Sequence, residues 1–233
     1  MTIEEFSDQF DTLLDSHKFE DEFGKVDNNY RIRLDEYEKS VLLTEAQDML
    51  LRMNFDTNFD ASEQGQIYFS NITAIAEGVE NLTIDPYTTD GKVYDLPDDL
   101  FWPLNERVID SKGYNYTIVP INFKEYDRIQ SKPYAKPLKR HAWRILQKGE
   151  TSEDIPTAEI IMRNDNTIAK YLIRYIRKPN PIILEDLGEL SIQGVSTPSE
   201  CELNPLAHFD ILLKAVEMAM SRYAPQREEP TNN

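Results

Sequence analysis

Few residues of this chain have the type and spacing that enzymes use. The three histidines, His17, His141 and His208, show no ligand-like spacing to one another or to the single cysteine, Cys201. Cys201 could serve as a thiolate nucleophile with His208 as its base, because the loop before a helix can lower a thiol pKa. We nevertheless expect structural roles for all four residues.

Carboxylates are abundant, and two groups lie close together in the sequence: Glu20-Asp21-Glu22, and Asp95 with Asp98 and Asp99. Such groups can bind a hard cation or act as acid and base, although in an acidic chain they are more often solvated surface. The motifs GxxxxGK[ST], GxGxxG, HExxH and GxSxG are absent. The sequence therefore predicts no catalytic residue, no cofactor, no metal site and no enzyme activity. A hydrolase with a carboxylate or thiol site is kept as a second alternative.

A basic stretch from residue 131 to 148 contains no acidic residue. Its aromatic neighbours, Tyr134, His141 and Trp143, give it the character of a nucleic-acid surface. The same charges could instead dock on an acidic region of an identical neighbour, or simply be solvated. Docking between unlike surfaces is head-to-tail, which closes into rings or extends into filaments. We predict an intersubunit interface here and keep a nucleic-acid-binding regulatory protein as the first alternative. The basic residues are Lys132, Lys136, Lys139, Arg140, Arg144 and Lys148.

The formal charge of −17 is unevenly distributed along the 233 residues. Residues 1–110 hold 26 Asp and Glu against 8 Lys and Arg, whereas residues 111–233 hold 16 against 17. The N-terminus has no export signal, and no apolar run reaches the roughly 18 residues of a membrane span. We therefore expect synthesis in a cytoplasm and no membrane partner.

Helices are predicted at both ends of the chain. Thr2 and Glu5 form a capping box for a helix at about 2–16, and helical spacing of apolar residues predicts a second at 34–53. Asn204-Pro205 is a start signal for a third. Along it, apolar residues step by three and four in a heptad-type seam, which we expect to pack on the 34–53 helix of the same chain or of a neighbour. The seam residues are Leu206, Phe209, Leu213, Val216, Met220 and Tyr223.

Between the helices the sequence favours strands, with the clearest runs at 114–121, 140–146, 158–162 and 169–177. Asn164-Asp165-Asn166 predicts that the last two form a hairpin. The fold class is therefore α+β, with a small bundle of terminal helices and a central antiparallel, sandwich or barrel-like β region. The expected parts are a helical segment at 1–54, a β-rich region at 55–200, a helix at 201–224 packing back on the first helices, and a disordered tail at 225–233.

Several short groups of residues occur in a recognisable order. As a set they resemble the head-to-tail connector proteins of tailed bacteriophages, the adaptor or ring (tail tubular-like) proteins below the portal, particularly those of crAss-like short-tailed phages. The groups are Leu96-Pro97-Asp98-Asp99-Leu100, Val119-Pro120-Ile121, Tyr134-Ala135-Lys136-Pro137, Tyr175-Ile176-Arg177-Lys178-Pro179 with Pro181-Ile182-Ile183-Leu184, and Cys201-Glu202-Leu203-Asn204-Pro205 with His208 and Ala215-Val216-Glu217.

This resemblance implies a structural virion protein at the tail or portal vertex, made in the cytoplasm of the bacterial host. It implies a homododecameric ring in register with the portal, with the portal protein and other tail ring proteins as partners. Genome DNA would pass through the central channel during ejection without specific binding. Carboxylates lining such a channel repel phosphate, which accounts for the negative charge. On this basis, part of the acidic surface of residues 1–110 is expected to face the lumen.

Overall fold

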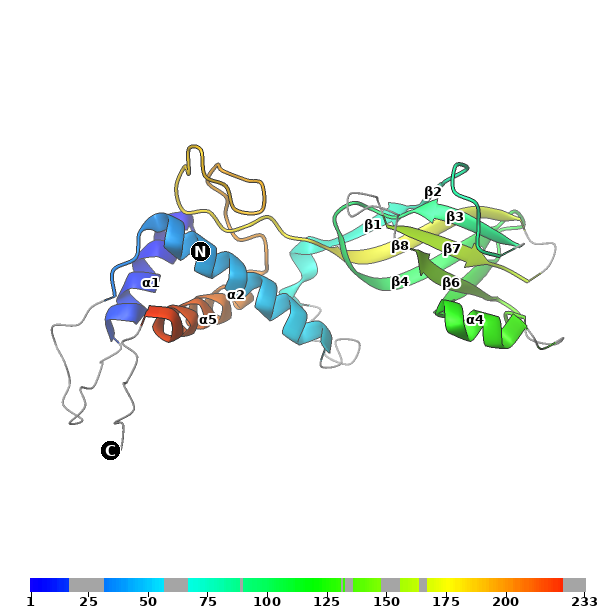
Figure 1. Ribbon diagram of the computed structural model, residues 1–233, viewed down its shortest axis with the longest axis horizontal. Helices are drawn as coiled ribbons and strands as arrows, with labels where there is room; N and C mark the ends of the chain where they lie inside the picture. The colour runs from blue at the N-terminus through cyan, green and yellow to red at the C-terminus, as the bar shows by residue number, and fades with distance from the viewer. Residues whose placement is uncertain are drawn as a thin grey trace, which may run out of the picture. The chain divides into compact units, whose positions relative to one another are not determined.

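The computed structural model describes residues 1–16, 32–56, 67–88, 90–130, 132, 136–147, 156–163 and 167–223. They form two units: a helical unit from both ends of the chain, Met1–Ile72 with Pro179–Asn233, and a barrel unit from the middle, Thr73–Lys178. Figure 1 shows the helices and strands of each unit. The α+β class predicted from the sequence is confirmed.

The helical unit is built on three long helices: α1 (Ile3–Ser16), α2 (Glu36–Asp56) and α5 (Pro205–Tyr223). A short 3-10 turn, η2 (Ser70–Ile72), ends its first part. The capping box forms as predicted, with the Thr2 N–H donating to Oε2 of Glu5 at 2.9 Å and the Glu5 N–H donating to Oγ1 of Thr2 at 3.2 Å. Asn204 caps α5 by accepting from the N–H of Leu206 at 3.1 Å. As expected, α5 packs back on α1 and α2.

The segment between the barrel and α5 runs along α2 and is held by polar side chains of that helix. Thr44 Oγ1 both donates to the carbonyl of Ile182 at 3.2 Å and accepts from its N–H at 3.1 Å. Ser40 accepts from the N–H of Leu184, and Gln47 donates to the carbonyl of Asn180. Ile183, between these residues, pairs with Ser199 in an antiparallel bridge, so the α2 side chains and this bridge together satisfy the backbone groups of the segment.

The barrel unit contains eight strands in the order β1-β8-β4-β5-β6-β7-β3-β2. Neighbouring strands are antiparallel except β5 and β6, which are parallel and joined through helix α4 (Phe123–Gln130). The strands are β1 (Thr73–Glu77), β2 (Val79–Glu80), β3 (Gly91–Asp95), β4 (Leu100–Asp110), β5 (Asn115–Pro120), β6 (His141–Gln147), β7 (Thr157–Ile161) and β8 (Ile168–Arg177).

The outermost strands of this sheet, β1 and β2, are two halves of one chain segment that bends at Gly78. The Gly78 N–H donates to the carbonyl of Tyr171 on β8 at 2.9 Å, and the Asn81 N–H donates to the carbonyl of Val93 on β3 at 2.8 Å. The bend lies against the Tyr171 ring, because a Cβ on Gly78 would stand 2.4 Å from Cδ1 of that tyrosine. The segment thus bridges both ends of the sheet and nearly closes the barrel.

The predicted hairpin between the last two strand runs is wrong. The second of these strands, β8, pairs with β1 and β4, whereas β7 pairs with β3 and β6. The turn residues 164–166 lie outside the described residues. Turn-forming residues between two apolar runs suit a tight hairpin, but they also suit a connection between strands far apart in a barrel, and local sequence does not distinguish the two.

The barrel has an apolar interior and one covered outer face. Inside lie Val108, Tyr171 and Ile173 with their neighbours. Outside, α4 covers β6 and β7 through Tyr126, which packs with Ile145 and Ile161. The carboxylate of Glu159, fully buried on that face, accepts hydrogen bonds from the backbone N–H groups of Tyr87 and Thr88 and so holds the loop before β3.

Candidate functional site: a basic pocket at one end of the barrel

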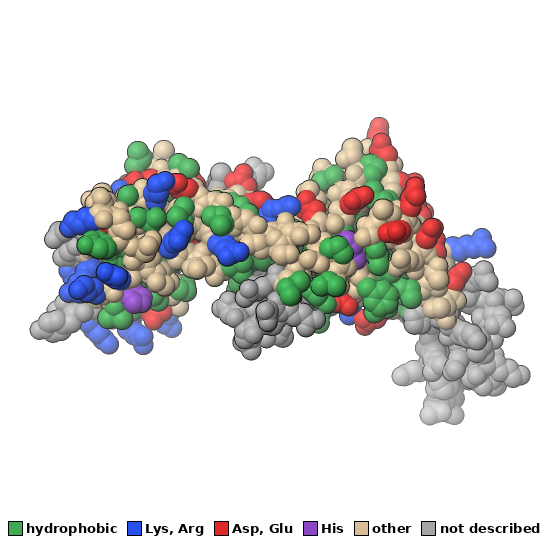
Figure 2. Space-filling model, turned by 180° about the vertical axis from the view of Figure 1, so that it is seen from behind, with side chains coloured by type: hydrophobic (Ala, Val, Ile, Leu, Met, Phe, Trp, Pro, Cys, Tyr) green, Lys and Arg blue, Asp and Glu red, His purple; other side chains and the backbone are tan. Residues whose placement is uncertain are grey.

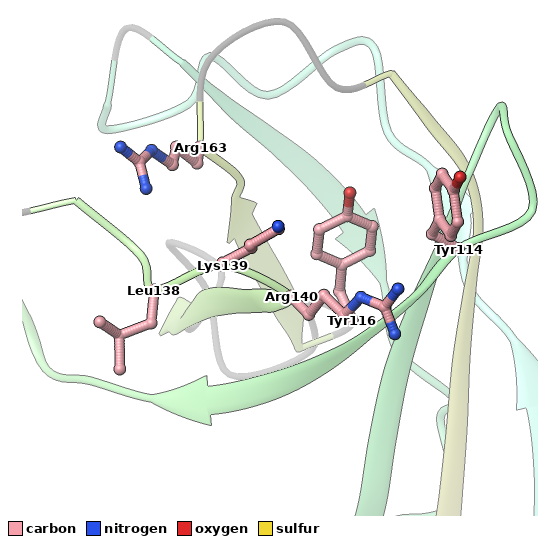
Figure 3. A pocket seen from close by; sticks show the side chains of 6 residues that line it. All are labelled: Tyr114, Tyr116, Leu138, Lys139, Arg140 and Arg163. Atoms are coloured by element: carbon pink, nitrogen blue, oxygen red, sulfur yellow. The ribbon is translucent and has the colours of Figure 1, made fainter.

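A pocket of about 330 Å³ lies at one end of the barrel, where β5 and β6 begin and β7 ends (Figure 3). Two tyrosines, one leucine and three cationic residues surround it: Tyr114, Tyr116, Leu138, Lys139, Arg140 and Arg163. The three cations come from two separate segments, one before β6 and one after β7. The parallel pairing of β5 and β6 brings the first segment beside the tyrosines.

Backbone geometry sets the direction of Arg140. Its φ of 64° lies in the left-handed region, which is uncommon for a residue with a side chain. Its carbonyl accepts from the N–H of Thr117 at 3.0 Å, and this bond joins the turn to β5. The Arg140 guanidinium carbon then stands 5.5 Å from the centroid of the Tyr114 ring, a cation–π contact.

A buried carboxylate, Asp110, supports the tyrosine wall. One of its oxygens accepts from the N–H groups of Lys112 and Tyr114 at 2.8 and 2.9 Å, and the other accepts from the Tyr116 hydroxyl at 3.0 Å. Burial alone would raise the pKa of Asp110, but these three hydrogen bonds to its charged form outweigh it and lower that pKa. Burial and the neighbouring carboxylate raise the pKa of Tyr116. The Tyr116 phenol is therefore held in place by Asp110 and stays neutral at physiological pH.

The cations of the pocket are available to an outside partner. Lys139, Arg140 and Arg163 are exposed, and within the described ranges none of the three forms an ion pair with a carboxylate. In Figure 3 the Lys139 side chain extends toward Tyr116, and the Arg163 guanidinium points away from the tyrosines. Three cations around one pocket can bind an anion such as a carboxylate or a phosphate.

The predicted basic stretch divides into different environments. Lys139 and Arg140 line the pocket, while Lys132 and Lys136 are exposed outside its lining. Lys148 lies outside the described residues. Arg163 was not predicted from the sequence, because it stands alone after a strand, 23 residues from Arg140, and only the strand pairing brings it near.

Arg144 does not lie on the exposed basic surface of the barrel unit. It is 7% exposed, its side chain lies inside the barrel, and its Nη1 stands 2.8 Å from Oε2 of Glu106. The expectation that it faces a neighbour is therefore corrected. Consecutive residues of a strand point to opposite faces, so a basic run that enters β6 must turn some of its members inward.

Two of the aromatic residues that suggested nucleic-acid binding, Trp143 and His141, make contacts within the barrel unit. Trp143 packs against Tyr126 of α4, with ring centroids 6.5 Å apart, in the cluster that covers the outer face of β6. Nδ1 of His141 lies 3.3 Å from the carbonyl of Lys139. Tyr134 lies outside the described residues. Among the described residues, Tyr114 and Tyr116 line the pocket together with the exposed Lys139 and Arg140.

The predicted seam of α5 mostly faces outward. Leu206, Phe209, Leu213 and Tyr223 are 62%, 49%, 45% and 38% exposed, and of the six seam residues only Val216 is fully buried. The face that packs on α1 and α2 is shifted around the helix and is rich in alanine. Small side chains allow helices to approach closely. The alanine-rich face of α5 is therefore buried, and the face with the larger residues stays exposed. The buried residues are Ala207, His208, Ile211, Leu212, Ala215, Val216 and Ala219.

Among the described residues, those considered for catalysis do not form a site. Burial raises the pKa of Cys201 to about 11, the opposite of an activated thiol, and the thiol donates to Oε1 of Gln47. Asp95 accepts from Asn81 and Asp99 from Tyr175, both structural contacts. His17 and residues 20–22 lie outside the described residues. Where the structure is described, no group of three His, Cys, Asp or Glu could hold a metal ion.

The charge of the chain is also divided unevenly between its two structural units. The helical unit contains 26 Asp and Glu and 9 Lys and Arg, for a net charge of −17, and the barrel unit contains 16 of each and is neutral. Figure 2 shows acidic side chains over the helical unit and a gathering of Lys and Arg on the barrel unit. Among the described helices, none has the length and apolar character needed to cross a membrane.

Comparison with known proteins agrees with the resemblance seen in the sequence. The family model described as "Phage tail ring protein 3/4" matches residues 1–230. "Ring protein 4/5" of Bacteroides phage crAss001 is 42% identical over 236 residues, covering 96% of this chain and 94% of the relative. "Ring protein 3" of the same phage is 36% identical, covering 94% and 95%. The chain therefore belongs to the tail ring protein family of crAss-like phages, whose members are structural components of the virion and not enzymes.

Proposed function

We propose that this ring protein assembles head to tail into a closed ring at the portal vertex that extends the DNA channel of the tail. The observation that carries the proposal is the division of charge between its units. A unit of charge −17 and a neutral unit with an exposed basic pocket offer two unlike, complementary surfaces on every copy. A contact between unlike surfaces repeats around a ring until it closes.

In this arrangement the pocket of one copy binds carboxylates on the helical unit of the next. Lys139, Arg140 and Arg163 supply the positive charge, and the Tyr114 and Tyr116 rings shape the cavity. Arginine and lysine pair well with carboxylates at such contacts, and the attraction weakens as salt screens it. The proposed contact between copies is therefore ionic and sensitive to salt.

The same charge division supports the proposal that the helical unit faces the lumen. On α1 the five charged residues are all acidic and exposed: Glu4, Glu5, Asp8, Asp11 and Asp15. A channel wall of this kind repels the phosphate backbone and lets DNA slide through without binding. Twelve copies would match a dodecameric portal, and neighbouring rings of the tail would stack above and below.

The interface is tested by the triple variant Lys139→Glu, Arg140→Glu and Arg163→Glu. We expect wild-type protein to form rings in native mass spectrometry at physiological salt, and the variant to remain at its monomer mass of 27.1 kDa. The matched control reverses three exposed cations elsewhere on the barrel unit, Lys124, Arg174 and Lys178, and should still form rings. Normal rings in the pocket variant would show that the interface lies elsewhere.

The lumen is tested by the variant Glu4→Lys, Asp8→Lys and Asp15→Lys, which keeps the capping residue Glu5. We expect its rings to retain duplex DNA in a gel-shift assay at low salt, whereas wild-type rings do not. If the variant and wild-type rings both ignore DNA, α1 does not line the channel. If the wild-type chain stays monomeric with every other tail component present, the ring proposal itself is wrong.

A further inference from the structure

The outer face of α5 carries a row of large apolar side chains that the described part of the helical unit leaves exposed. Leu206, Phe209 and Leu213 are 62%, 49% and 45% exposed, and Met220 is partly exposed. They follow one another at spacings of three, four and seven residues, so they lie as a stripe along one side of the helix, with Met220 two turns beyond Leu213. Hydrophobic side chains gather along one side of this unit in Figure 2.

Within the described residues, the helical unit does not pack against this stripe. The contact of α5 with α1 and α2 is already made by the opposite face, where Ala207, Ile211, Ala215 and Ala219 are fully buried. A heptad-type spacing of large apolar residues suits another helix, whose side chains interdigitate with the row. An exposed apolar row of this length on a virion subunit is typical of a contact with another chain.

The local charge favours a second copy of the same unit at this position. The helix α1 has a net charge of −5, with five acidic residues and no basic one, and α2 has −3, with five acidic and two basic residues. In α5, Asp210 and Glu217 are balanced by Lys214 and Arg222. Two helical units of charge −17 repel each other. Of the three long helices described, α5 alone has no net charge, so a contact made by α5 brings the fewest like charges together.

The charges that flank the stripe are also paired within the unit. Nζ of Lys214 stands 2.8 Å from Oε2 of Glu217, and Arg222 pairs with Glu45 of α2. Asp210 accepts from the Tyr68 hydroxyl at 3.0 Å. An approaching copy therefore meets apolar side chains bordered by charges that already have partners.

We infer that the outer face of α5, formed by Leu206, Phe209, Leu213 and Met220, is a second contact between copies, at which the helical units of neighbouring subunits touch. This inference rests on the proposed ring and adds an apolar interface to the ionic one at the basic pocket. The two contacts differ in their response to salt, because screening weakens the pocket and leaves the apolar stripe largely unaffected.

The test is the triple variant Leu206→Gln, Phe209→Gln and Leu213→Gln. Because all three side chains are exposed, circular dichroism and melting temperature should match the wild type. We expect the protein concentration at half assembly, measured by light scattering, to rise roughly tenfold or more. The matched control replaces three exposed apolar residues of the barrel unit, Ile75, Val79 and Leu82, with Gln and should assemble as the wild type does.

A second measurement keeps the inference testable even if the variant folds poorly. A photo-crosslinking benzoylphenylalanine at Leu213 of otherwise wild-type rings should join peptides of the helical unit of a neighbouring copy. Crosslinks to barrel peptides alone, or normal assembly of the stripe variant while the pocket variant fails, would overturn the α5 contact and leave the ring intact. A wild-type chain that never assembles would remove both proposals.

Discussion

Arg144 and Glu106 form an ion pair inside the barrel, with Nη1 of the arginine 2.8 Å from Oε2 of the glutamate. Both side chains are 8% exposed. Tyr171 donates its hydroxyl hydrogen to the other carboxylate oxygen, which ties β8 to β4 and β6 through one charged group. Because both ions have lost most of their hydration, each depends on the other for compensation.

Removing one member of this pair should destabilise the barrel strongly. We expect Arg144→Met to lower the free energy of unfolding by about 3–5 kcal/mol, because Glu106 stays buried without its counter-ion. Adding Glu106→Gln should restore part of the loss. Both tryptophans of the chain, Trp102 and Trp143, lie in the barrel unit, so fluorescence during urea unfolding reports on that unit. A loss below about 1 kcal/mol, similar to that of the exposed control Arg174→Met, would contradict the pair's structural role.

The hydroxyl of Thr44 should be essential to the helical unit. It serves both the N–H and the carbonyl of Ile182, and the residue is 2% exposed. Thr44→Val keeps the shape but leaves two buried backbone groups without partners, at a cost of about 1–3 kcal/mol. Thermal unfolding followed by circular dichroism at 222 nm measures the effect. Thr12→Val, an exposed position whose hydroxyl donates to the Asp8 carbonyl, is the control and should change stability little.

His208 should make the helical unit sensitive to mild acid. It is buried against Phe6, its Nε2 lies 3.0 Å from the Leu203 carbonyl, and its Nδ1 lies 2.8 Å from the amino nitrogen of Met1. Burial lowers its pKa from 6.5. The unfolded chain therefore takes up the proton first, and the stability present above about pH 6.5 is lost as the pH falls.

Comparison with His208→Gln isolates this effect from the titration of the many carboxylates. Between pH 7.5 and 5.5 we expect the wild type to lose up to about 1 kcal/mol more than the variant, as measured by urea unfolding followed by circular dichroism. Identical pH profiles for the two proteins would mean that His208 takes up its proton equally well in the folded state.

Cys201 should react slowly with thiol reagents. A pKa of about 11, raised from 9.0 by burial, lowers the thiolate fraction at pH 7.5 by about 100-fold. We expect alkylation by iodoacetamide to be slower by about that factor in the folded protein than in urea. Cys201→Ser should assemble like the wild type, and equal rates in folded and unfolded protein would refute the protected thiol.

The helix ends could be predicted from the sequence because their signals are local. Thr2 with Glu5 and Asn204 with the next turn each satisfy backbone groups within three residues, so the pattern is complete in a short window. The outward face of α5 could not be predicted in the same way. Both faces of α5 are apolar, and which of them is buried depends on how closely α1 and α2 approach the helix.

The barrel could be predicted only in outline because its contacts are distant in sequence. The longest strand, β4, was missed, since Pro103 and two shifts in register around it interrupt the alternation expected of a strand. The short helix α4 was missed too, although Asn122 caps it with a 2.7 Å bond to the N–H of Glu125. Arg144 looked like a surface residue because Glu106, its partner, is 38 residues away.

The bend at Gly78 limits how copies of this protein can join. An open sheet offers unpaired backbone groups to any extended chain, and subunits can then fuse by strand addition or exchange. Here the outermost strands, β1 and β2, are only five and two residues long and belong to one segment. Strand addition at these short edges is therefore disfavoured, and contacts through side chains, which sequence changes can alter freely, are favoured instead. Related rings in one tail can thereby diverge in partner choice while keeping the same barrel.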